Sequence, residues 1–201
     1  MEILKCMCIT LKHLRRILRH KFWVAYYCFQ LGLYKQGILH DLSKFGWYEF
    51  SRSVKFYDDD TSPLNKEKEI LGYSRSYLHH RGRNPHHYEY WVTKLDIGGV
   101  PVKMPKEYAL ELVCDYLAAG KVYNGNSFQG EYNWWIKYIN SPRAIHPETK
   151  EFITQCFKNL ASGKGLVNMC NNFDQVIVSN SHRDINYRPS NENLTVIDVC
   201  K

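Results

Sequence analysis

The hexapeptide HDLSKF, residues 40–45, brings an imidazole, a carboxylate and an amine together in one short stretch. Apolar residues surround His40 and Asp41, which favours burial of this pair within a helix. The flanking apolar residues are Ile38, Leu39, Leu42 and Phe45. A buried charge without a partner is strongly unfavourable, and a metal ion is a partner that accepts imidazole and carboxylate ligands together. The stretch therefore indicates a candidate metal site at His40 and Asp41.

Further imidazole and carboxylate groups recur along the chain, on or beside segments with helical spacing. They are His20, the pairs His79–His80 and His86–His87, and Asp115. Imidazole and carboxylate suit first-row transition metals, and an aspartate that can bridge two ions suits a binuclear centre. Because adjacent helical residues point about 100° apart, we expect one histidine of each pair to face inward. We choose His80 over His79, and leave His86 and His87 both as candidates.

Apolar spacing and turn residues predict the helices that position these groups. The expected helices cover residues 9–31, 34–44, 46–57, 65–80, 85–91, 105–120, 131–139 and 148–161. His20 then lies inside the first helix, and Asp115 inside the helix that Pro105 opens and Gly120 ends. DDDTSP and DIGGVPVKM are expected as loops, since their composition is typical of turns.

The domain organisation is read from the change in composition beyond Gly163. Residues 1–162 are expected to form one all-helical domain, and residues 163–201 a less regular tail or short-strand appendage. In that tail QVIVSN and LTVIDV have the composition of short strands. The fold class predicted for the chain is all-α.

Charge and cysteine content limit the class of partner. The 201 residues carry a formal net charge of +7, which favours an anionic partner such as a small phosphorylated substrate, above all a nucleotide, and also allows nucleic acid. The seven cysteines include no CxxC pair, so we expect reduced thiols and a cytoplasmic protein. No apolar run approaches the roughly 20 residues that span a bilayer, so no membrane partner is expected. A homo-oligomer is compatible with these features.

The order of these residues, a histidine, then His-Asp, then a distant aspartate, resembles the HD-domain superfamily of metal-dependent phosphohydrolases. HDLSK is similar to the HDxxK motif of that superfamily. LHHRGRNPHH resembles the additional histidines of its binuclear and trinuclear branches, which include cyclic-dinucleotide phosphodiesterases and mixed-valence di-iron oxygenases. HDLSKF, NPHHYEYW and MPKEYALELVCDYLAAG also look like an uncharacterised family of small bacterial and phage proteins, over roughly residues 10–160.

The superfamily resemblance implies an HD-like helical bundle that holds one or two divalent ions of Mn, Fe, Zn, Co or Ni. The ligands it implies are His20, His40, Asp41 as the bridge, Asp115, His80, and His86 or His87. His13 is an alternative first ligand on the same helix, and Glu111 an alternative carboxylate. Lys44 matches the lysine of HDxxK, and would approach the substrate phosphate or the hydroxide bound to metal. Charge and proximity in sequence add Arg81 and Arg83 as phosphate binders.

The function expected from these residues is hydrolysis of a nucleotide or another phosphate ester through a water activated by metal. The catalytic residues would be Asp41 and Lys44. Two alternatives use the same residues differently. With two iron ions the site would be an oxygenase, and without turnover the chain would be a basic protein that binds nucleotide or nucleic acid and uses its histidines for structural metal.

Overall fold

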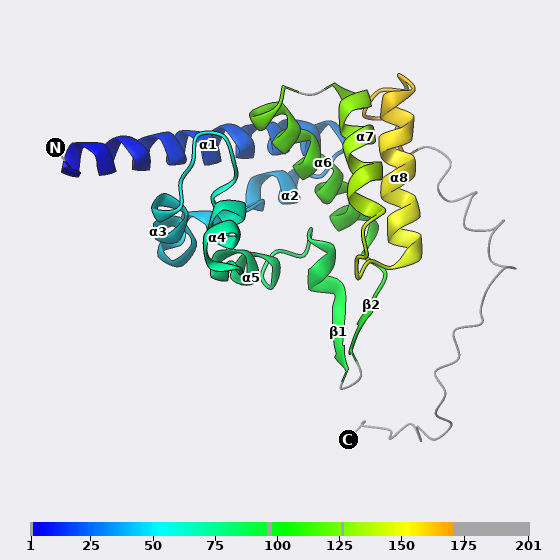
Figure 1. Cartoon of the computed structure of the whole chain (residues 1–201). Helices are drawn as coiled ribbons and strands as arrows, with labels where there is room; N and C mark the ends of the chain where they lie inside the picture. The colour runs from blue at the N-terminus through cyan, green and yellow to red at the C-terminus, as the bar shows by residue number, and fades with distance from the viewer. Residues whose placement is uncertain (1, 96–97, 126, 171–201) are drawn as a thin grey trace, which may run out of the picture. The chain divides into compact units, whose positions relative to one another are not determined.

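The described part of the chain folds into a bundle of α-helices with one small hairpin (Figure 1). The structure is a computed structural model, and it describes residues 2–95, 98–125 and 127–170. The helices are α1 (Glu2–Gln30), α2 (Tyr34–Leu39), α3 (Trp47–Lys55), α4 (Pro63–Leu71), α5 (Arg75–Arg81), α6 (Lys106–Tyr123), α7 (Phe128–Ile139) and α8 (Pro147–Ala161). Two 3-10 turns, η1 (Leu42–Phe45) and η2 (Tyr88–Trp91), complete the helical part. The all-α prediction is confirmed.

Helix α6 forms the centre of the packing, because its residues are buried on nearly all sides. Leu112, Val113 and Ala118 of this helix are wholly inaccessible to solvent. One side of α6 packs on α1, and another side packs on α8. Burial of each large apolar side chain contributes roughly 1.5–3 kcal/mol to folding. The packing of α6 therefore holds α1, which carries His20, against the helix that carries Asp115.

Helix α1 has one buried row of side chains, spaced three or four residues apart. The row consists of His13, Ile17, His20, Val24 and Cys28. This spacing places all of them on one face of a helix with 3.6 residues per turn. Two of the five are histidines, so the face that packs on the core also brings imidazole groups into the interior.

The prediction of a helix over residues 34–44 is wrong at His40 and Asp41, which lie beyond the end of the helix. Helix α2 ends at Leu39, and Asp41 adopts a left-handed backbone conformation with φ 54°. Lys21 Nζ donates to the carbonyl oxygens of Ile38 and His40 at 2.7 and 2.8 Å, so the turn after α2 is tied to α1. The four flanking apolar residues are exposed rather than buried: Ile38, Leu39, Leu42 and Phe45. His40 and Asp41 are buried because the chain turns inward between two helical segments.

Other expected boundaries also move for local reasons. The single helix expected over 65–80 is two helices, since Gly72 turns left-handed after α4 and the Ser74 hydroxyl accepts from the Tyr77 N–H to begin α5. Pro63, not Asn65, is the first residue of α4. Helix α6 continues past Gly120 to Tyr123, so Gly120 does not end it. The glycine instead leaves room for the carboxylate of Glu131, which lies where a β-carbon of residue 120 would be.

The segment between α5 and α6 contains less helix and more strand than expected. Only η2 is helical in the predicted helix over 85–91, so His86 and His87 lie in the loop before it. Strand β2 (Gly98–Pro101) lies within DIGGVPVKM, which was expected as a loop, and it pairs with β1 (Val92–Leu95) in an antiparallel hairpin.

The described chain remains packed beyond the expected domain boundary at residue 162. Leu166 and Met169 are buried, and Asn159 Nδ2 of α8 donates to the carbonyl oxygen of Met169 at 2.8 Å. The compact helical unit accordingly reaches Cys170. The strands expected at QVIVSN and LTVIDV lie outside the described residues. Within the described part of the chain, no helix is both long and apolar enough to span a membrane.

The contact between α1 and α2 depends on Gly37, which leads to a prediction about stability. A β-carbon at residue 37 would lie 2.9 Å from Phe29 Cε1 and 3.1 Å from Ala25 Cα. We expect Gly37→Val to lower the free energy of unfolding by about 1–3 kcal/mol, because the two helices must move apart. Urea denaturation measures this change. Lys35→Val, at an exposed position of the same helix, is the control, and equal losses in the two variants would contradict the prediction.

Candidate metal centre

Asp41 lies at the centre of a buried cluster, with its two carboxylate oxygens facing different histidines. Oδ1 lies 3.1 Å from His80 Nε2 and 3.5 Å from His86 Nε2. Oδ2 lies 3.2 Å from His40 Nε2 and 3.9 Å from His20 Nε2. A carboxylate in this position can contact two cations at once, one through each oxygen.

The surrounding side chains form two groups that share Asp41. The first group, group A, is His20, His40, Asp41 and Asp115. The second group, group B, is Asp41, His80, His86 and His87. In each group the potential ligand atoms lie within 4.8 Å of one another, and every member is buried. Both groups could hold a metal ion, because imidazole nitrogen and carboxylate oxygen are suitable donors for first-row transition metals.

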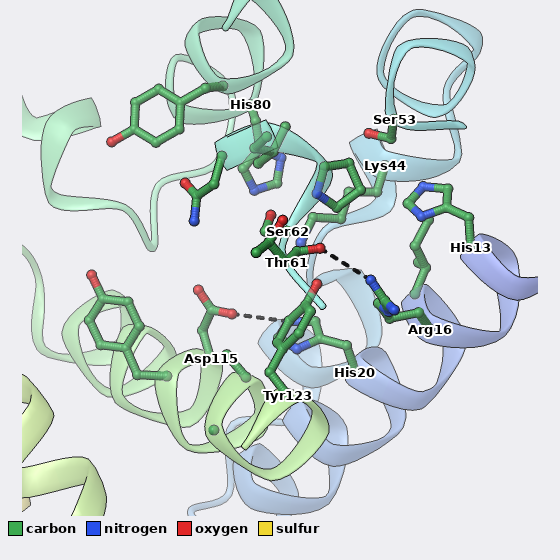
Figure 2. A pocket seen from close by; sticks show the side chains of 18 of the residues that line it. His13, Arg16, His20, Lys44, Ser53, Thr61, Ser62, His80, Asp115 and Tyr123 are labelled. Atoms are coloured by element: carbon green, nitrogen blue, oxygen red, sulfur yellow. Dashed lines mark hydrogen bonds and ion pairs between the residues drawn. The ribbon is translucent and has the colours of Figure 1, made fainter. Parts of the chain in front are cut away.

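Group A joins three parts of the fold. Asp115 Oδ1 of α6 lies 3.0 Å from His20 Nε2 of α1 and 3.7 Å from His40 Nε2, which follows α2. Figure 2 shows Asp115 and His20 directed toward each other from these two helices. Residues far apart in the sequence therefore meet because α1 and α6 pack side by side.

The cluster contains buried polar atoms that have no hydrogen-bond partner. They include Nε2 of His20, His40 and His86, and both oxygens of Asp41, although Asp41 Oδ2 also forms an ion pair with Lys44 Nζ. The short distances between these atoms are close approaches without hydrogen-bond geometry. Buried polar atoms almost always have a hydrogen-bond partner. A set of such atoms that converge on one another without partners therefore requires an explanation. Bound metal ions would explain these unpartnered atoms, since the lone pairs of the imidazole nitrogens and of the carboxylate could then be donated to metal. The residues therefore fit a metal site.

Two further carboxylates orient the histidines from behind. Glu111 Oε1 lies 2.8 Å from His40 Nδ1 and 3.2 Å from His86 Nδ1. Glu49 lies 2.7 Å from His79 Nδ1 and 3.0 Å from His80 Nδ1. A carboxylate that accepts from Nδ1 leaves the Nε2 lone pair directed into the cluster, as is common behind metal-binding histidines.

His87 differs from the other histidines because its Nδ1 faces a cation. The Nη1 of Arg81 lies 2.5 Å from His87 Nδ1. A guanidinium group can only donate, so Nδ1 is the acceptor and the ring proton is on Nε2. Burial, reinforced by His86 and Arg81, holds the pKa of His87 well below its ordinary value, so the ring is neutral. In this arrangement His87 offers the cluster an N–H, whereas His86 offers a lone pair.

Opposite charges within the cluster compensate one another. Burial disfavours the ionised carboxylate of Asp41, but His40, Lys44 and His80 outweigh it and hold its pKa well below the ordinary value. Burial likewise opposes a charged His40, while Asp41, Asp115 and Glu111 raise its pKa well above the ordinary value. The raised pKa of His40 and the lowered pKa of Asp41 have the same cause, which is the attraction between the two groups at the centre of the cluster.

Lys44 is the remaining cation beside the central carboxylate. Its Nζ lies 2.5 Å from Asp41 Oδ2. Burial opposes the charge, yet Asp41 and Asp115 raise the pKa of Lys44 to about 12. Lys44 is accordingly protonated throughout the neutral range.

A cavity of about 430 Å³ opens onto one side of the cluster. Its lining includes His20, His80, His87 and Asp115 from the cluster, together with Lys44. His40, Asp41 and His86 lie behind this layer. Figure 2 shows His13, Arg16 and Lys44 along the same cavity. The cavity is large enough for a small organic molecule, and its lining carries positive charge next to the candidate ligands.

The loop that covers part of the cavity is tied to α1 by Arg16. Arg16 Nη1 donates to the carbonyl oxygen of Asp58 at 2.7 Å, and Nη2 donates to that of Asp59 at 2.7 Å. Thr61 and Ser62 of this loop border the cavity (Figure 2). Arg16 thereby contributes charge to the cavity while its N–H groups position the loop.

The structure brings together most, though not all, of the site residues predicted from the sequence. His80 enters group B, whereas His79 is partly exposed and rests on Tyr48. Arg81 borders the cavity, but Arg83 is exposed and outside its lining. His13 borders the cavity but belongs to neither group, and Glu111 stands behind His40 and His86 in a third potential set with them.

Glu49 is the functional candidate that the sequence analysis missed. It is 2% exposed and contacts both histidines of the pair at 79–80. No local pattern distinguishes this glutamate from a solvent-facing acid in an amphipathic helix. Only the packing of α3 on α5 shows its partners.

Comparison with known proteins yields one family. A family described as "Family of unknown function (DUF5662)" matches residues 10–159. Neither a curated protein nor a solved structure matches the chain. The matched range contains every member of groups A and B.

The orphaned ligand atoms predict that metal binding depends on Asp41. We expect the protein purified without chelator to hold up to two equivalents of transition metal, and Asp41→Ala to lose both, because the two groups share this carboxylate. Elemental analysis by mass spectrometry measures the content, with His40→Ala as a second variant. His13→Ala, a buried histidine outside both groups, is the matched control and should keep the metal. Unchanged metal in Asp41→Ala would contradict this assignment.

The environment of His13 predicts a change of stability with pH. Burial, followed by repulsion from Lys44 and Arg16, lowers the pKa of His13 from 6.5 to about 4. The unfolded chain therefore binds a proton at residue 13 below about pH 6.5, while the folded chain binds it only near pH 4, and stability is lost between these values. With chelator present, the free energy of unfolding should fall between pH 7 and pH 4.5 in both proteins. We expect this fall to be about 2 kcal/mol smaller in His13→Phe than in the wild type.

Urea denaturation at the two pH values tests the His13 prediction. Val167→Ala, a change at an exposed and non-ionisable position outside the cavity, should follow the wild-type pH dependence. If His13→Phe loses as much stability as the wild type, His13 is not buried in its neutral form.

Proposed function

We propose that the chain, which belongs to the family of unknown function DUF5662, is a metal-dependent phosphohydrolase of the HD type. Its substrate would be a nucleotide or another small phosphate ester. The observation that carries this proposal is the position of Asp41, with one oxygen toward group A and the other toward group B.

The chain's residues divide into two sets of candidate ligands. His20, His40 and Asp115 would hold one divalent ion with Asp41, and His80 and His86 would hold a second ion with the same carboxylate. When bound, such ions lower the pKa of water toward neutrality and offset negative charge on phosphate oxygens. Glu111 and Glu49 would keep the imidazole rings oriented, since each accepts from Nδ1 of a histidine.

Lys44 is placed to bind the phosphate. It borders the cavity and remains protonated, as its pKa of about 12 requires. A fixed cation next to the reacting phosphate stabilises the charge that develops in the transition state. Arg81 adds a further positive charge to the lining beside Lys44 and Arg16, although its Nη1 is directed to Glu89 and His87.

His87 would supply a hydrogen bond to the substrate. Its Nε2 is buried and has no partner, and the ring borders the cavity. Because Arg81 holds the proton on Nε2, this N–H can donate to a phosphate oxygen or to the leaving group. His87 thus has a substrate-binding role in this proposal, in contrast to the ligand role of His86.

The proposed function predicts phosphatase activity that requires both Asp41 and Lys44. We expect metal-loaded protein to hydrolyse p-nitrophenyl phosphate or a nucleoside phosphate. Lys44→Gln should lower kcat/KM about 10²–10³-fold while the metal content is kept, because a charge-stabilising donor is removed. Asp41→Ala should abolish turnover. Arg83→Gln, outside the cavity lining, is the matched control and should retain activity.

The outcomes of this assay separate the proposed function from its rivals. Full phosphatase activity in Asp41→Ala would overturn the mechanism. A coloured, iron-loaded protein that consumes oxygen without phosphatase activity would point to the oxygenase. Salt-sensitive nucleotide binding without turnover in any metal would leave the binding protein as the explanation.

A further inference from the structure

The solvent face of α1 carries an apolar stripe that nothing in the described chain covers. Its members recur every three or four residues, and they lie opposite the buried row that contains His13 and His20. The stripe consists of Leu4, Met7, Leu11, Leu18, Phe22, Tyr26 and Phe29, and each of these residues is between 43% and 72% exposed. Only Arg15 interrupts its spacing. A helix of a monomeric protein usually places polar residues on this face.

The stripe continues onto α2. The ring of Phe29 contacts the ring of Tyr34 with centroids 5.4 Å apart, and Ile38 follows one turn later. Tyr34 and Ile38 are 62% and 57% exposed. Exposure of this extent over nine large side chains amounts to an area on the order of 1,000 Å². That area exceeds the roughly 300–600 Å² of the largest patch on a typical monomer, and it matches the approximately 800 Å² per partner of a standard interface.

The spacing of the stripe is symmetric about Phe22. Leu18 and Tyr26 lie four residues before and after it, and Arg15 and Phe29 lie seven residues before and after it. When two identical helices pair in antiparallel orientation about a two-fold axis at Phe22, each position of this set faces another position of the set. Isologous contacts of this kind are the commonest form of association between identical chains.

We propose that this face of α1 binds a second copy of the chain, with the two α1 helices antiparallel and Phe22 on the two-fold axis. Leu18 would pack on Tyr26 of the second copy. Arg15, the one charged residue of the stripe, would lie over Phe29 of the second copy, where a guanidinium group is attracted by the aromatic face. Leu11 would extend past the end of the opposite α1, toward Tyr34 and Ile38 of the second copy.

The charge of α1 agrees with this register. In the antiparallel pair the two Arg15 side chains are separated along the helix by fourteen positions, or about 21 Å at 1.5 Å per residue. Repulsion between them is largely screened at that separation. A register centred on Arg15 would instead bring the two guanidinium groups together. The pairing would leave the buried row of α1, and with it the metal centre, unchanged.

Sedimentation equilibrium of the full chain tests the proposal. We expect a mass of twice 23.8 kDa at micromolar concentration, and a monomer for Phe22→Glu, because the variant places two carboxylates on the two-fold axis. Ile70→Glu, at a 58% exposed position of α4, is the matched control and should remain a dimer. Circular dichroism shows whether each variant is folded. A wild-type monomer at 100 µM would overturn the proposal, as would a monomer that floats with anionic phospholipid vesicles.

Cross-linking determines the register independently of Phe22→Glu. In a background with Cys6, Cys8, Cys170 and Cys200 replaced by serine, Phe22→Cys should be joined to its copy by a short bismaleimide. Leu18→Cys and Tyr26→Cys should cross-link much more efficiently when mixed than alone, since each faces the other residue. Ile70→Cys should give no product. Efficient cross-linking at Ile70→Cys and none at Phe22→Cys would place the interface elsewhere.

Discussion

The ionised carboxylate of Asp41, buried among four histidines and a lysine, is the constraint on which the arrangement of the site depends. A carboxylate this deep is stable only when it is paired with positive charge or coordinates a metal. The chain meets this requirement by ending α2 at Leu39 and turning inward, with Lys21 of α1 bound to the two nearby carbonyl oxygens. The left-handed conformation at Asp41 is the local cost of directing both oxygens into the cluster.

The surrounding helices follow from the same requirement. Histidines come from α1, the turn after α2, α5 and the loop before η2, so no single element could form the cluster. Glu111 and Glu49 lie behind these histidines and link α6 and α3 to the centre. The carboxylates therefore have two roles, because the same contacts that orient the imidazole rings also join helices that are distant in sequence.

Helix α1 connects the proposed activity with the proposed association. Its buried row supplies His20 to the cluster and His13 to the cavity, while its opposite face carries the stripe centred on Phe22. Pairing of two such helices would hold α1 from both sides and would make the ligand helix more rigid. A single 29-residue helix would thus serve as part of the metal centre and as the contact between two chains.

The sequence by itself determined the long helices and the residue types at the site. Periodicity revealed α1 and α6, and the types of His20, His40, Asp41 and Asp115 indicated metal chemistry. Periodicity reports only which residues share a face within a few turns, so it wrongly continued the helix through His40 and Asp41, and it did not find Glu49. Tertiary packing alone decided that His80 faces inward, that Arg83 lies outside the cavity, and that Nδ1 of His87 faces Arg81 while Nδ1 of His86 faces Glu111. These outcomes depend on contacts between side chains from separate elements, and such contacts leave no signature in local sequence.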